Sequence, residues 1–145
     1  MSKPVVILDT SVVVSTFLST QQSSALDVIK LAFKKDIILA SSLEILQELQ
    51  QKIASEKIKK HPNFNSKKVG QFIAWYKYNV QFYSIENDLV VPISRDHSDD
   101  IFLFLAKYVQ ADHLISLDND LLVLKYFYDT EIVTPSDFMQ VYKSK

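Results

Sequence analysis

Four acidic residues offer the clearest chemistry in this sequence, and three of them stand at the ends of predicted elements. Asp9 and Asp118 each follow a short apolar run that is typical of a strand. Ligands of open parallel sheets bind beyond the carboxyl ends of the strands, so acids that follow two such strands meet at one edge. Asp100 opens an apolar helix whose N-terminus faces that edge if the helix leads into the next strand. Glu48 lies farther along its own helix, and the pattern leaves its convergence open.

Carboxylates that share a site repel one another, and a bound cation relieves that repulsion. Oxygen ligands suit Mg²⁺ or Mn²⁺, whereas the three histidines lack the spacing of zinc ligands. Structural roles stay open for single acids: Asp100 as a helix cap, Asp118 with Asp120 as turn residues, and Glu48 as a solvated helix residue. Taken together, Asp9, Glu48, Asp100 and Asp118 favour a site for a divalent metal ion.

The composition fits one globular domain and excludes several kinds of site. The chain has 145 residues, 48% of them hydrophobic and 23% charged, and no apolar run approaches the length of a membrane span. Gly70 is the only glycine, which argues against the glycine-rich loops that wrap phosphates. The absence of cysteine excludes disulfides, thiolate zinc sites and a cysteine nucleophile. The N-terminus lacks a signal-peptide pattern, and we expect a cytoplasmic protein.

Charge is distributed unevenly along a chain whose net charge is only −1. Segment 52–77 contains seven lysines against Glu56 alone, and segment 96–120 contains six aspartates against Lys107 alone. A basic and an acidic segment of similar length are consistent with a polyanion held beside a cation site. The alternative is that the lysines form a solvated helix face.

Short apolar runs alternate with stretches of helical spacing. The runs predict buried strands over 5–8, 37–40, 114–117 and 132–133. The spacing predicts helices over 25–33, 45–53, 66–80, from 100 onward, and 135–142. Ser41 with Glu44 is a possible capping box, Ser66 a possible N-cap, and 90–93 a loop or weak strand. Alternating strands and helices imply a parallel sheet wound by crossover connections.

Four segments resemble, in order and at suitable spacing, the motifs of PIN-domain ribonucleases: 5–12, 42–49, 95–103 and 114–122. Residues 134–138 resemble the end of those domains, so the resemblance spans essentially the whole chain. The similarity is closest to bacterial and archaeal toxins of toxin–antitoxin pairs, the relatives of VapC. It implies one PIN-like domain over 1–145, with a three-layer α/β/α fold around a central parallel sheet of four or five strands. It also implies Mg²⁺- or Mn²⁺-dependent endonuclease activity on RNA.

The resemblance assigns the acids by position. Asp9, Glu48, Asp100 and Asp118 match the four acids of the family and are expected to be catalytic, with Asp9, Asp100 and Asp118 as metal ligands. Other residues match accessory positions or compete with these assignments: Asp120 as an accessory acid, Ser11 and Ser116 as small polar companions of the first and fourth acids, Glu44 as the rival of Glu48, and Asp99 and Asp96 as rivals of Asp100.

The resulting hypothesis is hydrolysis of an RNA phosphodiester, with flanking phosphates held by Lys52, Lys107 and Arg95. Tyr76 and Trp75 are candidates for base stacking, although core packing is favoured for both. The resemblance further implies a cognate antitoxin, a homodimer and no membrane. The alternative is a PIN-fold binding module with little or no nuclease activity, acting through protein or RNA partners. The RNA target, and the choice between one and two metal ions, are not readable from the residues.

Overall fold

A six-stranded sheet forms the centre of the protein. The computed structural model describes residues 2–84 and 99–143, so the predictions for 90–93, Arg95 and Asp96 lie outside the described residues. The strand order is β3-β2-β1-β4-β6-β5. Every neighbouring pair is parallel except β5–β6, which is antiparallel. The strands are β1 (Val5–Leu8), β2 (Ile38–Ser42), β3 (Gln81–Tyr83), β4 (His113–Ile115), β5 (Tyr126–Phe127) and β6 (Thr130–Val133).

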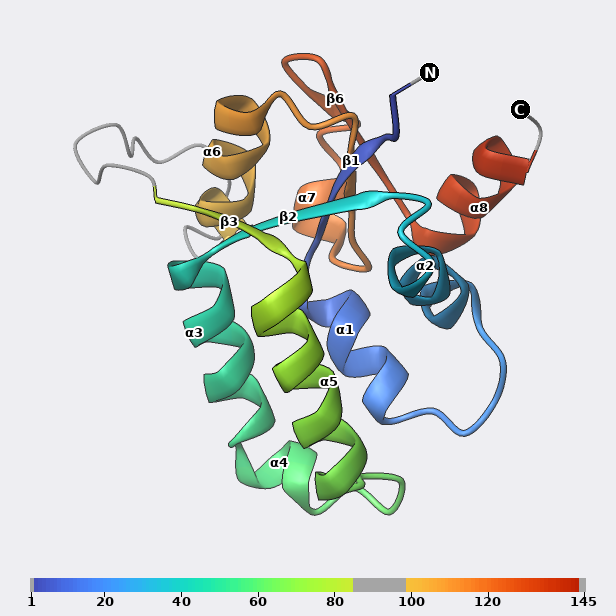
Figure 1. Ribbon diagram of the computed structural model, residues 1–145, viewed down its shortest axis with the longest axis vertical. Coiled ribbons are helices and arrows are strands. Elements are labelled where there is room, and N and C mark those ends of the chain that lie inside the picture. Colours follow the sequence, from blue (N-terminus) through green and yellow to red (C-terminus); the bar gives the residue numbers. More distant parts are fainter. Residues whose placement is uncertain (1, 85–98, 144–145) are drawn as a thin grey trace.

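Helices connect and cover the strands. They are α1 (Thr10–Phe17), α2 (Ser24–Phe33), α3 (Leu43–Ile53), α4 (Glu56–Lys59), α5 (Ser66–Asn79), α6 (Asp100–Val109), α7 (Asn119–Leu122) and α8 (Pro135–Lys143). In Figure 1, β2 crosses the middle of the molecule, with α1, α3 and α5 below it and α6 above it. No helix in the described ranges has both the length and the apolar content that crossing a bilayer requires.

The sheet is buried on both faces, as the continuous apolar strands predict. Successive side chains of a strand point to opposite faces, so Val6 and Leu8 join one apolar cluster while Ile7 joins another. The first cluster includes side chains from α1, α2, α3, α5 and α8. The second is built mainly on α6, with Leu121 of α7. This arrangement confirms the predicted α/β fold with helices on both faces of the sheet.

Strand number is where the prediction falls short, since the sheet has six strands rather than four or five. The additional strands are short: β3 has three residues and β5 has two. Runs of that length show neither an alternation nor an apolar stretch that a sequence pattern can reveal. Among the strands of residues 2–84 and 99–143, β5 alone runs antiparallel to its neighbour, because it forms a hairpin with β6.

Two predicted helix caps are wrong by one residue. Ser42 rather than Ser41 caps α3, since Ser42 Oγ accepts a hydrogen bond from the Ile45 N–H at 3.2 Å. Asn65 rather than Ser66 caps α5. In both cases the capping residue has extended backbone torsions, as an N-cap requires.

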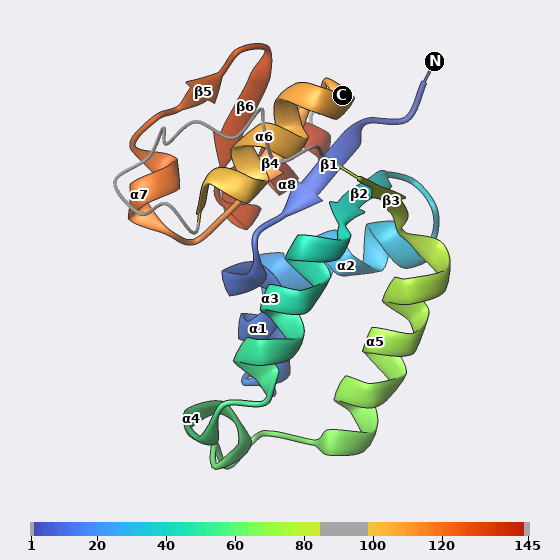
Figure 2. The same ribbon diagram turned by 90° about the vertical axis from the view of Figure 1, so that its left-hand side faces the viewer.

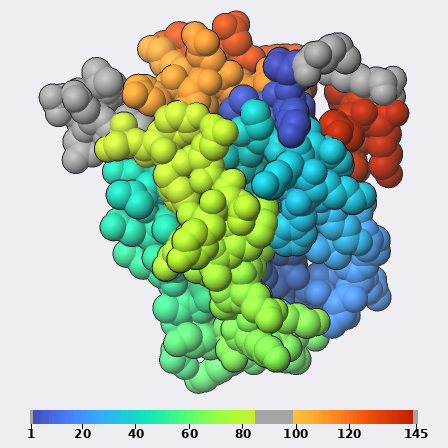
Figure 3. All heavy atoms as spheres, viewed as in Figure 1, coloured from blue at the N-terminus to red at the C-terminus, as the bar shows by residue number. Residues whose placement is uncertain are grey.

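Tyr76 is a core residue, which confirms the packing interpretation over base stacking. Its side chain is 3% exposed, and its hydroxyl donates to Ser41 Oγ at 2.6 Å. Burial raises the pKa of Tyr76 to about 12, although the hydrogen bond to Ser41 opposes the shift. Trp75 packs edge-on against Phe33, with ring centroids 4.5 Å apart. Helix α5, which carries both aromatics, lies across the front of the molecule in Figure 3.

Candidate functional site

The ends of β1 and β4 lie side by side and bring Asp9 next to Ser116. Leu8 pairs with Ile115, and the ladder continues one step further because the Asp9 N–H donates to the Ile115 carbonyl oxygen at 2.9 Å. The Asp9 side chain is almost fully buried, at 2% exposure. Its Oδ2 accepts hydrogen bonds from Ser116 Oγ at 2.7 Å and from Ser11 Oγ at 2.9 Å. Both serines therefore orient the first acid of the site.

Ser116 also positions the fourth acid. Its Oγ accepts a hydrogen bond from the Asp118 N–H at 2.9 Å, so one buried hydroxyl contacts both aspartates. The strand predicted over 114–117 ends at Ile115, because Leu117 is exposed rather than buried, and Asp118 therefore follows β4 by three residues. Asp118 is the N-cap of α7, and its Oδ1 accepts from the Asp120 N–H at 2.9 Å. The turn role that the sequence left open for Asp118 is therefore present. The same turn holds the Asp118 carboxylate at the edge of the sheet, so the turn role is compatible with binding of a metal ion.

Three carboxylates converge closely at this edge. Asp99, Asp118 and Asp120 each offer one oxygen, and these three atoms lie within 4.8 Å of one another. Asp99 is buried just before α6, while Asp118 and Asp120 come from the start of α7. In Figure 2 the start of α6 and helix α7 lie near one another, beyond the end of β1. Asp100, which is also buried, is not a member of this group, whereas its rival Asp99 is.

Glu48 meets the site through a hydroxyl that sequence reasoning did not select. Thr10 Oγ1 lies 3.4 Å from Glu48 Oε2 and 3.4 Å from Asp9 Oδ1. Lys52 Nζ donates to the same Thr10 oxygen at 2.9 Å and lies 4.0 Å from Glu48 Oε1. Packing of α1 against α3 brings these residues together. The sequence feature that could have indicated this role is a threonine directly after Asp9, at the start of the helix that follows the first strand.

Other predicted site residues lie elsewhere. Glu44 is exposed, one turn before Glu48, and the contacts with Thr10 and Lys52 are made by Glu48. Lys107 lies seven residues after Asp100, which is about 10 Å along the helix. Its ammonium contacts Tyr128, 3.3 Å from the hydroxyl and 4.4 Å from the ring centroid. The structure therefore brings Lys52 to the acids and leaves Lys107 at the other end of α6.

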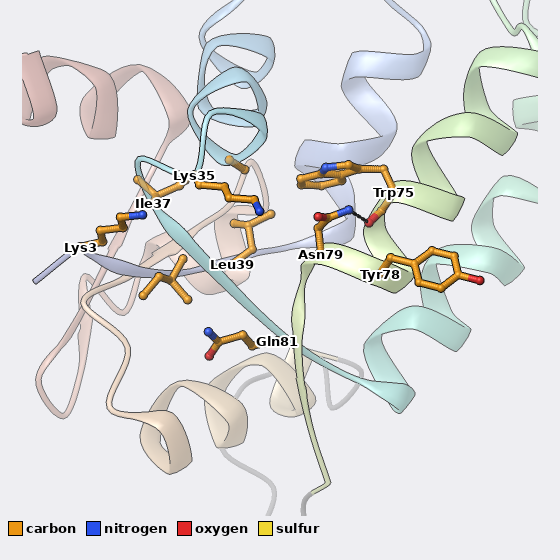
Figure 4. Close-up of a pocket in the computed structure, with 10 residues that line it drawn as sticks. Lys3, Lys35, Ile37, Leu39, Trp75, Tyr78, Asn79 and Gln81 are labelled. Carbon is orange, nitrogen blue, oxygen red and sulfur yellow. Dashed lines mark hydrogen bonds between the residues drawn. The ribbon is translucent and has the colours of Figure 1, made fainter.

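A separate hollow opens at the opposite end of the sheet. It has a volume of about 510 Å³ and is lined by residues just before β1, at the start of β2 and at the end of α5, among them Lys3, Leu39 and Asn79 (Figure 4). Asn79 Nδ2 donates to the Trp75 carbonyl oxygen at 2.9 Å, and Tyr78 points away from the hollow. The acids lie beyond the carboxyl ends of the strands, whereas this hollow lies where β2 begins. The hollow and the acidic site are therefore distinct.

The sequence was compared with family profiles and with curated proteins. The family profile described as "PIN domain" matches residues 5–120, which include β1, all the acids described above and the start of α7. No curated protein matches the chain. The matched range stops before β5, β6 and α8, although β6 pairs with β4 in the central sheet.

Proposed function

Because the chain belongs to the PIN-domain family, whose members are usually metal-dependent nucleases, we propose that it is a divalent-metal-dependent endoribonuclease. The observation that carries the proposal is the convergence of Asp99, Asp118 and Asp120 oxygens within 4.8 Å at the carboxyl edge of the sheet. This is the edge at which open parallel sheets place their ligands.

The donor set fits a hard cation. Every candidate ligand is a carboxylate, and Mg²⁺ and Mn²⁺ prefer oxygen ligands of this kind. Asp99, Asp118 and Asp120 would hold the ion, with Asp9 and Asp100 as the further ligands that the family resemblance implies. Asp9, Asp99 and Asp100 are all buried, and buried carboxylates held together favour a compensating cation. A bound ion would supply an acidified water and charge stabilisation on the phosphoryl oxygens.

The chain's own groups prepare this chemistry. Ser11 and Ser116 hold Asp9 in one orientation, so the carboxylate needs little rearrangement when substrate and metal bind. Lys52 carries a positive charge at the rim of the site, where its side chain is 49% exposed, and would contact an RNA phosphate. A role for Lys107 or Arg95 on flanking phosphates belongs to the same proposal.

The toxin assignment is the finer part of the proposal. It is supported by the resemblance of four ordered segments to toxins of the VapC type, and it carries with it a cognate antitoxin and a homodimer. A cytoplasmic location is proposed on the same basis. Inhibition of cell growth on expression, relieved by the product of a short neighbouring gene, is the expected result for a toxin.

The test combines metal binding with RNA cleavage. We expect wild-type protein to bind Mn²⁺ in calorimetric titration and to cleave single-stranded RNA only when Mg²⁺ or Mn²⁺ is present. Asp9→Asn and Asp118→Asn should abolish cleavage while leaving the melting temperature equal or higher, because the repelling charge that each substitution removes outweighs the weaker serine hydrogen bonds at Asp9. Asp137→Asn, an exposed aspartate of α8, is the matched control and should cleave at the wild-type rate. Full cleavage by either site variant would refute the assignment, and failure of the wild type to bind Mn²⁺ would favour a binding module.

A further inference from the structure

Lys52 reaches the acidic edge from α3 and makes two contacts there. Its ammonium donates to Thr10 Oγ1 at 2.9 Å and lies 4.0 Å from Glu48 Oε1. A lone exposed ion pair contributes little to stability, and the pair Lys60–Glu56 on α4 is of that kind, with both side chains 78% exposed. Lys52 differs because it also bonds a hydroxyl that is buried against the first acid.

Both oxygens of the Glu48 carboxylate have a partner within the chain. Oε1 faces Lys52, and Oε2 lies 3.4 Å from Thr10 Oγ1. The converging oxygens that suit a metal ion come instead from Asp99, Asp118 and Asp120. The converging oxygens therefore belong to three aspartates, whereas Glu48 lies outside that group and has the ammonium of Lys52 beside it.

Thr10 joins these two sides. Its hydroxyl has one proton, which it can donate to Asp9 Oδ1 or to Glu48 Oε2, both 3.4 Å away. Because the oxygen of that hydroxyl also accepts from Lys52, the ammonium leaves the proton free to point toward either acid. Thr10 thus keeps Lys52 and Glu48 together beside the first acid.

We propose that Lys52 neutralises Glu48 in place of a second divalent ion, so that the centre takes up one metal ion per chain and Glu48 acts as a positioning residue. The inference rests on the proposed metal-dependent function and specifies it further. Two-metal nucleases hold their ions about 3.5–4 Å apart with shared carboxylates. The lysine ammonium is a compact positive charge with three hydrogen-bond donors. Beside Glu48 it compensates the negative charge that a second metal ion would otherwise compensate.

Metal stoichiometry tests the inference without reference to catalysis. Mn²⁺ is titrated into the full chain by calorimetry, and electron paramagnetic resonance is recorded at saturation to detect spin coupling between neighbouring ions. The variants are Lys52→Met and Lys52→Gln, which remove the charge, and Lys52→Arg, which keeps it. Lys60→Met is the matched control, because Lys60 and Glu56 have the same spacing on an exposed helix away from the acids.

We expect one Mn²⁺ per chain in the wild type, in Lys52→Arg and in Lys60→Met. Lys52→Met and Lys52→Gln should bind two ions with a spin-coupled spectrum, and their first ion should bind about tenfold more tightly because a repelling charge is gone. Two ions in the wild type, or one ion of unchanged affinity in both neutral variants, would overturn the inference and leave the nuclease proposal intact. A wild type that binds no Mn²⁺ would refute the nuclease proposal itself.

Discussion

Ser116→Ala removes the hydroxyl that contacts both Asp9 and Asp118. The side chain is fully buried; it donates to Asp9 Oδ2 at 2.7 Å and accepts from the Asp118 N–H at 2.9 Å. The substitution deletes one oxygen atom and leaves the backbone of β4 unchanged. It therefore isolates the contribution of this pair of hydrogen bonds.

The expected cost follows from what each partner loses. A hydrogen bond to a charged group contributes about 1.5–3 kcal/mol net, and a donor left without its partner costs about 1 kcal/mol or more unless water replaces the bond. The Asp118 N–H is only partly buried, so water recovers part of its loss. We expect Ser116→Ala to lower the free energy of unfolding by about 2–4 kcal/mol. Ser11→Ala removes a bond to the same Oδ2. Because Ser11 is only partly buried, water can replace part of that bond, and this substitution should cost about 1 kcal/mol or less.

Urea unfolding in metal-free buffer measures these differences through the fluorescence of Trp75, the only tryptophan. Repeating Ser116→Ala in an Asp9→Asn background completes a double-mutant cycle. The serine should cost at least about 1 kcal/mol less there, because its partner is no longer charged. Cleavage of RNA should also fall about 10–100-fold in Ser116→Ala, as when a residue that orients a metal ligand is lost. A cost below about 0.5 kcal/mol, or an equal cost in both backgrounds, would refute the reasoning.

Two other predictions concern the core and the third acid. Burial raises the pKa of Tyr76 to about 12, so the folded state favours the protonated phenol. The stability that comes from this preference is complete below the unfolded-state pKa near 10 and is lost as the pH rises through 12. The free energy of unfolding should fall by about 1.4 kcal/mol per pH unit in that window, and Tyr76→Phe should remove this component in alkaline denaturation curves; identical curves for both proteins would contradict it. Asp99→Asn should weaken Mn²⁺ binding more than Asp100→Asn does, since the Asp99 oxygen is the one in the converging group; calorimetric titration of both variants checks this, and the reverse order would restore Asp100 as the third ligand.

The position of Asp9 and Asp118 at one edge was predictable from their neighbours in the chain. Each follows an apolar run that is typical of a buried strand, and parallel strands place their carboxyl ends together. The register of β1 with β4 bears out this placement, and the contacts of Ser116 join the two acids. Their roles as ligands remain predictions.

The choice between Asp99 and Asp100 was not predictable, because adjacent residues at a helix start project about 100° apart. Which of them faces Asp118 and Asp120 depends on how α6 packs on the sheet, through contacts with β2, β4 and β5 that are distant in sequence. A pattern of residue types has no access to that rotation.

The surroundings of Glu48 depend on packing in the same way. Glu44 and Glu48 lie one turn apart, and their sequence positions do not distinguish them. The packing of α1 against α3 brings Thr10 to Glu48 and Lys52, so that the exposed Glu44 is left outside. Local periodicity thus predicted which residues end strands and face the sheet edge, whereas the partners of each acid depend on long-range contacts between helices, which no local pattern encodes.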